Sequence, residues 1–208
     1  MPKRILLDND FILKISTLDL VDEFLHLPFV YASELRHLSS LPFMIKKGGL
    51  RNYTDVGLGR ALDWLLTFPA IEALAPQSID RIPQLSGIDP GERFLLGSVL
   101  EIVESSIFTG DKRCITAIGG LSSELREAFT GKVLCLEAAI CAIVAQNDFD
   151  RVASKVRPGL SCDKALLSIF GSSAPSNRAS VCEGLASYIG SISSTPGGAV
   201  LISWEALL

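Results

Sequence analysis

Two apolar segments of this chain each run into an aspartate. Residues 5–7 (ILL) are followed by Asp8, and residues 107–109 (IFT) lead through a glycine to Asp111. Short apolar runs of this kind predict buried strands. In open parallel α/β sheets the functional crevice lies beyond the carboxyl ends of the strands, so two acids delivered there from different strands can converge on one cation.

Four acids lie at the boundaries of predicted strands and helices: Asp8, Glu34, Glu92 and Asp111. A carboxylate cluster is costly without a cation, because two unit charges about 4 Å apart repel by about 4 kcal/mol at an effective dielectric of 20. Mg²⁺ and Mn²⁺ prefer oxygen ligands of this type. The joint occurrence of the four acids therefore favours a metal site, and a zinc site is not expected.

Each acid also has a purely structural interpretation. Asp8, Asp10 or Asp111 suits the N-cap of the helix that follows it. Glu92 suits the third position of a capping box, and Glu34 in a first helical turn would be favoured by the helix dipole. Taken singly, these interpretations account for each acid, and only the set points to a cluster.

The elements that would position these acids alternate between strand and helix. Apolar runs predict strands at 3–7, 29–32, 107–109 and 132–136, and helical spacing or helix-start signals predict helices from 11, at 19–27, from 33, at 57–75, 89–104, 122–130 and 137–146. This alternation predicts a three-layer α/β/α fold with a central, mostly parallel sheet.

The pattern changes after residue 146. Residues 148–192 predict three helical stretches with no strand between them, and residues 199–202 predict an edge strand. A chain of 208 residues is long enough for one good-sized core with an appendage. We therefore expect an α/β domain over residues 1–146 and a mostly helical extension over residues 147–208.

The composition limits the partners and the compartment. A net charge of −4 and a pI near 5.2 predict low affinity for RNA. A hydrophobic fraction of 48% with only 20% charged residues predicts that a homo-oligomer or another protein covers part of the surface. The five scattered cysteines suit reduced thiols in the cytoplasm. No apolar run approaches the roughly 20 residues of a membrane span, and no signal peptide is expected.

One short stretch of the chain is locally basic. Lys46, Lys47, Arg51 and Arg60 lie close together in the sequence with Tyr53 and four glycines. This composition predicts either a mobile basic loop with an aromatic residue, which suits phosphate binding, or an ordinary solvated loop.

Taken in order, four segments resemble the PIN-domain ribonucleases, many of which are toxins of bacterial toxin–antitoxin pairs. ILLDNDFIL (5–13) is similar to the opening strand and acid, YASEL (31–35) to the second acid, GERFLLG (91–97) to the third and IFTGDKR (107–113) to the last. The resemblance covers residues 3–146. Asn9 and Asp10 stand where members often have Thr or Ser and then Asn, and Glu92 stands where many have Asp.

The resemblance implies a metal-dependent endonuclease that cleaves RNA phosphodiesters, with an antitoxin as partner if the chain is a toxin. It implies Mg²⁺ or Mn²⁺ held by Asp8, Glu92 and Asp111, with Glu34 as a fourth catalytic acid. The residues expected to orient water or to touch the metal or substrate phosphates are Asn9, Asp10, Lys46, Lys47, Arg51, Lys112 and Arg113.

Two other functions fit the same residues. Asp8 and Asp10, two positions apart after a strand, also resemble the nucleophile and general acid of haloacid-dehalogenase phosphatases. Against this, Asp111 is not followed by the further acid that this family usually has. The third interpretation is a non-catalytic PIN-like interaction module, in which Glu92 serves only to cap its helix. No dinucleotide fingerprint or phosphate-binding glycine loop is found, so no nucleotide cofactor is expected.

Overall fold

The chain folds around a four-stranded, all-parallel sheet. A computed structural model describes the backbone of residues 3–72 and 76–208 and the side chains of residues 3–72 and 78–208. The strand order is β2-β1-β3-β4. The strands are β1 (Lys3–Leu7), β2 (Ser33–His37), β3 (Ser105–Thr109) and β4 (Val133–Cys135).

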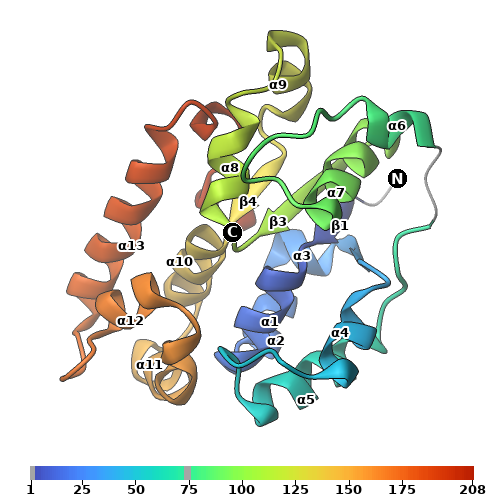
Figure 1. The fold of residues 1–208 in the computed structure, drawn as a ribbon. Helices are drawn as coiled ribbons and strands as arrows, with labels where there is room; N and C mark the ends of the chain where they lie inside the picture. The colour runs from blue at the N-terminus through green and yellow to red at the C-terminus, as the bar shows by residue number, and fades with distance from the viewer. Residues whose placement is uncertain (1–2, 73–75) are drawn as a thin grey trace.

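Helices connect and follow these strands (Figure 1). Before β3 they are α1 (Asn9–Thr17), α2 (Val21–Leu25), α3 (Pro28–Tyr31), α4 (Leu41–Lys47), α5 (Asp55–Leu65), α6 (Pro76–Asp80) and α7 (Pro90–Glu101). After β3 they are α8 (Lys112–Ile118), α9 (Ser123–Phe129), α10 (Leu136–Gln146), α11 (Phe149–Val156), α12 (Lys164–Phe170) and α13 (Arg178–Ser193), with 3₁₀ turns η1 (Arg157–Cys162), η2 (Gly198–Val200) and η3 (Trp204–Leu207). None of the helices in the described ranges is long and apolar enough to cross a membrane.

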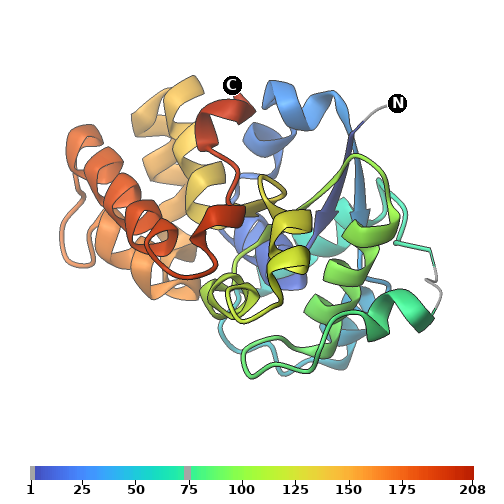
Figure 2. The ribbon, with the colours of Figure 1, turned by 90° about the horizontal axis from the view of Figure 1, so that it is seen from above.

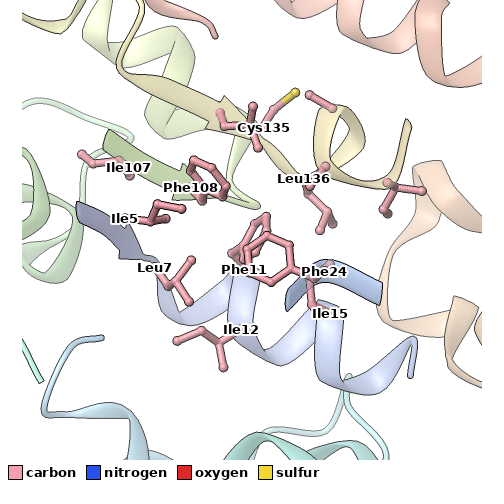
Figure 3. Packing of buried hydrophobic residues seen from close by; sticks show 14 of the residues in the cluster. Ile5, Leu7, Phe11, Ile12, Ile15, Phe24, Ile107, Phe108, Cys135 and Leu136 are labelled. Atoms are coloured by element: carbon pink, nitrogen blue, oxygen red, sulfur yellow. The ribbon is translucent and has the colours of Figure 1, made fainter. Parts of the chain in front are cut away.

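Helices cover both faces of the sheet, so the predicted three-layer α/β/α fold is confirmed. On one face, Phe11 of α1 and Phe24 of α2 contact Phe108 of β3 edge-on, with ring centroids 5.8 and 6.0 Å apart (Figure 3). The right-handed connection of parallel strands brings α7 and α8 to the opposite face. Because helices cover β1 on both faces of the sheet, the side chains of residues 5–7 are completely buried whichever face they point to.

The region around β2 differs from the prediction. Residues 29–32 were predicted as a strand, but Pro28–Tyr31 forms the one-turn helix α3, and the strand begins only at Ser33. Pro28 at the first helical position favours the turn, and the Ser33 hydroxyl donates a hydrogen bond to the Phe29 carbonyl at 2.6 Å. Glu34 therefore lies in a strand that pairs with β1, not in a helix.

The helix predicted over residues 57–75 is shorter in the structure. α5 ends at Leu65, and residues 73–75 lie outside the described residues. The short helix α6 lies between this helix and the next one, α7. The helix predicted at 89–104 begins as expected, with Asp89 and Glu92 forming both hydrogen bonds of a capping box.

The C-terminal part is helical, as predicted, and packs closely on the rest of the chain. α10 contacts α13, and Figure 2 shows α11, α12 and α13 (orange to red) gathered beside α10. Val152, Leu166 and Leu185 from this part belong to the same buried core as the sheet. At residues 199–202, where an edge strand was predicted, only Leu201 forms a single parallel bridge, to Val133 of β4.

Candidate functional site

The acids meet where the strand order changes direction. β1 connects to β2 on one side of the sheet, whereas β3 and β4 lie on the other, so the crevice between the ends of β1 and β3 is a topological switch point. Asp8 follows β1 directly, and Asp111 follows β3 by two residues. The N-terminus of α7 brings Glu92 to the same place.

A cavity of about 190 Å³ lies at this crevice, and we call it the acid pocket. One part of its lining is acidic and consists of Asp8, Asp10, Asp89, Glu92 and Asp111. The rest is apolar or neutral and consists of Asn9, Leu13, Leu38, Met44, Leu50, Tyr53 and Gly91. The pocket thus places carboxylates opposite an apolar wall formed largely by α4 and the loop after it.

Asp8 lies at the N-cap position of α1, but its side chain makes no capping hydrogen bond. The capping interpretation of this residue is therefore wrong. Its carboxylate instead accepts a hydrogen bond from the Thr109 hydroxyl at 3.0 Å, across the two central strands. Burial, and then the negative charges of Asp10 and Glu92, raise the pKa of Asp8 to about 7. This carboxylate has no cationic partner among the described residues.

Glu92 combines a capping role with a place in the acid pocket. Its Oε2 accepts the backbone N–H of Asp89 at 2.7 Å, as the capping box requires. Burial, opposed by this hydrogen bond and aided by the charges of Asp89 and Asp111, raises the pKa of Glu92 to about 7. The capping box uses one carboxylate oxygen of Glu92, and a hydrogen bond from the Cys114 thiol to this side chain also lowers its pKa.

Asp111 caps α8, as its structural interpretation predicted. Its Oδ1 accepts the backbone N–H of Arg113 at 2.7 Å, and its Oδ2 accepts from the Arg113 guanidinium at 2.7 Å. Although burial raises the pKa of Asp111, the hydrogen bonds from Arg113 hold it below its ordinary value. Asp111 is therefore the carboxylate of the three that is already ionised and paired.

Asp10 belongs to a buried ionic network. Its carboxylate accepts a hydrogen bond from the Tyr53 hydroxyl at 2.5 Å and pairs with the Lys14 ammonium at 2.6 Å. Lys14 also pairs with Asp163 at 2.8 Å and donates to the Gly110 carbonyl at 3.2 Å. The network therefore fixes α1, the loop before α5, the turn after β3 and the N-terminus of α12 to one another.

Glu34 does not reach the acid pocket. Glu34 is paired with Arg4 in the register of β1 and β2. Arg4 precedes Asp8 by four positions, a separation of about 13 Å along a strand. Its carboxylate pairs with Arg4 at 3.3 Å and with Arg36 at 3.0 Å. The structure thus separates Glu34 from the other three predicted acids, because β2 begins later than the sequence indicated.

The predicted basic residues fall into two groups. Lys112 lies over the ring of Tyr188 in α13, 4.7 Å from its centroid, and so points away from the acid pocket. Lys46, Lys47 and Arg51 are exposed on α4 and the loop that follows it. These three residues flank the apolar wall of the acid pocket, because Met44 and Leu50 line it.

The predicted metal site is only partly assembled. Within the described ranges, no three His, Cys, Asp or Glu side chains lie close enough to hold an ion as they stand. Mg²⁺ commonly needs only one or two carboxylates, with water and substrate phosphates completing its octahedron. Asn9 lines the pocket, and its Oδ1 is buried without a hydrogen-bond partner among the described residues. The all-oxygen donor set, with this unpartnered amide oxygen, fits a hard divalent cation.

Sequence reasoning missed Thr109, Lys14 and Asp163. Thr109 carried a usable signal, since it is a polar residue at the end of a buried strand two positions before Asp111. Lys14 had a weaker one, because it follows Asp10 by one helical turn. Nothing local indicates Asp163, which reaches the network from the C-terminal helices.

Comparison of the chain with protein-family models, with curated proteins and with solved structures gives no match in any of the three. The functional argument therefore rests on the acid pocket.

The buried carboxylates predict how stability depends on pH. The pKa values of Asp8, Glu92 and Glu137 rise from ordinary values near 4 to about 7. Between about pH 4 and pH 7 the folded chain therefore binds more protons than the unfolded chain, so stability falls as the pH rises. In EDTA, we expect the free energy of unfolding from urea titrations to be lower at about pH 8 than at about pH 5.5, by a few kcal/mol. Equal stability at both values would contradict the burial of these charges.

Proposed function

We propose that this chain is a metal-dependent nuclease that hydrolyses RNA phosphodiester bonds, as the PIN-domain ribonucleases do. The observation that carries the proposal is the acid pocket itself. Asp8, Glu92 and Asp111 arrive there from three different elements at a topological switch point, and two of them are buried with raised pKa values. Such a cluster gains most from a divalent cation and a phosphate between its members.

A bound Mg²⁺ or Mn²⁺ would polarise the scissile phosphate and lower the pKa of the attacking water. Asp8, Glu92 and Asp111 would hold the ion. The Thr109 hydroxyl orients the Asp8 carboxylate through its 3.0 Å hydrogen bond. Asn9, whose Oδ1 has no partner among the described residues, would have to turn its side chain toward the pocket to bind water or the ion. Arg113, paired with Asp111 at the pocket, is placed to meet a substrate phosphate.

The contacts of Asp10 disfavour the phosphatase alternative. That mechanism requires a carboxyl group two positions after the nucleophile to donate a proton to the leaving oxygen. Asp10 instead accepts from Tyr53 and pairs with Lys14 at 2.6 Å. Its carboxylate is held by donors on both sides, so it is poorly placed to deliver a proton to a substrate.

The non-catalytic alternative is favoured by one observation, the complete capping box of Glu92. If Glu92 only caps α7, the pocket should bind Mn²⁺ no better than exposed surface carboxylates do. If the pocket is a metal site, Mn²⁺ should bind near neutral pH and displace protons from Asp8 and Glu92. Calorimetric titration of Mn²⁺ in two buffers of different ionisation enthalpy measures both the affinity and the proton release.

Cleavage assays test the proposed activity directly. The purified chain, incubated with a labelled single-stranded RNA, is expected to cleave it with Mg²⁺ or Mn²⁺ and to stop when EDTA is added. A phosphomonoester such as p-nitrophenyl phosphate serves as the comparison substrate and should not be turned over. Phosphate release from the monoester without RNA cleavage would support the phosphatase instead. An antitoxin partner, a homo-oligomer and a cytoplasmic location remain predictions that these assays do not touch.

A further inference from the structure

One face of α4 presents an aromatic ring to solvent beside the acid pocket. α4 buries Leu41 and Ile45, so Phe43 lies on the opposite side of the helix, and it is 73% exposed. Lys47 follows Phe43 by one helical turn and therefore lies on the same face. Met44, the next residue, lines the acid pocket. We call Phe43, Met44 and Lys47 the α4 platform.

The surroundings of Phe43 distinguish it from an ordinary exposed apolar residue. Single exposed apolar side chains are normal on soluble proteins. Phe43 is instead continuous, through the partly exposed Met44, with the apolar wall of the acid pocket. The same helix carries the exposed Lys46 and Lys47, and the loop after it carries the exposed Arg51; none of the three has a carboxylate partner within the described residues.

An exposed aromatic ring beside unpaired cations suits the binding of single-stranded nucleic acid. Unpaired nucleotides offer flat bases that stack on aromatic rings and phosphates that attract lysine and arginine. In a duplex the bases stack on one another and are not available to Phe43. The chain carries a net charge of −4 and as a whole repels phosphates, so a polyanion would bind at a local basic surface such as the one next to the pocket.

We infer that the α4 platform binds an unpaired stretch of nucleic acid next to the acid pocket. A base stacks on Phe43, its backbone phosphate lies near Lys47, and the chain continues past Met44 into the pocket. This inference rests on the proposed function only where it leads the strand into the acid pocket, which would cleave it. The platform itself is a binding surface and needs no metal.

Binding measurements without metal test the platform. Fluorescence anisotropy of labelled oligo-U RNA and oligo-dT DNA, each about 12 nucleotides long, is titrated in EDTA and about 50 mM salt, where phosphate contacts are strong. Phe43→Ala should weaken binding by roughly fivefold or more, the range expected for loss of one stacked base. Phe43→Trp should bind as tightly as the natural chain. Lys47→Gln should weaken binding and lower its salt dependence.

Tyr31 provides the matched control. It is an aromatic residue with 83% exposure. It ends α3 just before β2 begins, so it lies at the amino-terminal ends of the strands, whereas the acid pocket lies beyond their carboxyl ends. Tyr31→Ala should leave binding unchanged. Wild-type affinity in Phe43→Ala, an equal loss in Tyr31→Ala, or equal binding of a blunt duplex would overturn the inference. Circular dichroism confirms that each variant is folded.

These outcomes are separable from failure of the proposed function. If the natural chain binds single strands through Phe43 but cleaves nothing with any metal, the platform stands and the nuclease proposal fails. If the chain cleaves RNA while Phe43→Ala binds normally, the nuclease stands and the platform fails. The probe that binds more tightly, RNA or DNA, shows whether the α4 platform prefers ribose or deoxyribose.

Discussion

Replacing Asp8 with Asn is expected to lower RNA cleavage by about 10² to 10³ while the protein becomes more stable near pH 8. The loss follows because the variant removes one of two buried carboxylates proposed to hold the ion, and losses of this size are typical when one electrostatic group of an active site is removed. The gain follows because burial raises the pKa of Asp8 to about 7, so the ionised carboxylate destabilises the fold at higher pH. The asparagine keeps an oxygen for the Thr109 hydroxyl.

Opposite changes in activity and stability distinguish a functional carboxylate from a structural one. Initial cleavage rates and urea titrations at about pH 8 measure the two quantities. Asp22→Asn is the control, because Asp22 is exposed on α2 and should change neither. Cleavage by Asp8→Asn within tenfold of the natural rate, or a clear loss of its stability, would count against the proposed site.

Replacing Lys14 with Met is expected to cost about 3 to 5 kcal/mol of unfolding free energy, the usual consequence of removing one partner from a buried ion pair. Only 11% of the Lys14 side chain is exposed. Although burial lowers the pKa of its ammonium, the carboxylates of Asp10 and Asp163 raise it above its ordinary value. Without this ammonium, both carboxylates lie beside an apolar side chain and oppose folding.

Two further variants test whether the network explains that loss. Adding Asp163→Asn to Lys14→Met should recover part of the stability, because one uncompensated carboxylate is then removed. Lys164→Met changes a neighbouring exposed lysine and should stay within about 0.5 kcal/mol of the natural chain. Urea titration at constant pH measures these variants and Asp163→Asn alone. A double variant as unstable as the sum of its single variants would indicate that the ion pairs do not act together.

Local signals were enough to predict much of the fold. The apolar runs that end at Asp8 and Asp111 gave the two central strands, and the capping box of Glu92 gave the start of α7. The error at β2 has a physical cause. Residues 29–32 have the aromatic and β-branched composition of a strand, but Pro28 and the Ser33 hydroxyl stabilise a helical turn there. Local propensity was overridden, and Glu34 was misplaced as a consequence.

The candidate site was less predictable, because its organising contacts join distant parts of the chain. The Thr109 hydroxyl and the Asp8 carboxylate are 101 positions apart in sequence, and Tyr53 and Asp10 are 43 apart. A sequence pattern reports spacing along one element and says little about which loop reaches another. Three of the four predicted acids, Asp8, Glu92 and Asp111, could therefore be identified by type and position, whereas the groups that orient them required the folded chain.

The pairing of Lys14 with Asp163 also bears on the order in which the chain is made. Synthesis proceeds from the N-terminus, so Asp10 and Lys14 are made long before Asp163. The strand ends carrying Asp8 and Asp111 are complete while Asp163 is still to be added, so Lys14 has only Asp10 as a carboxylate partner until then. The ionic link that joins α12 to α1 and to the turn after β3 therefore forms only once Asp163 has been added.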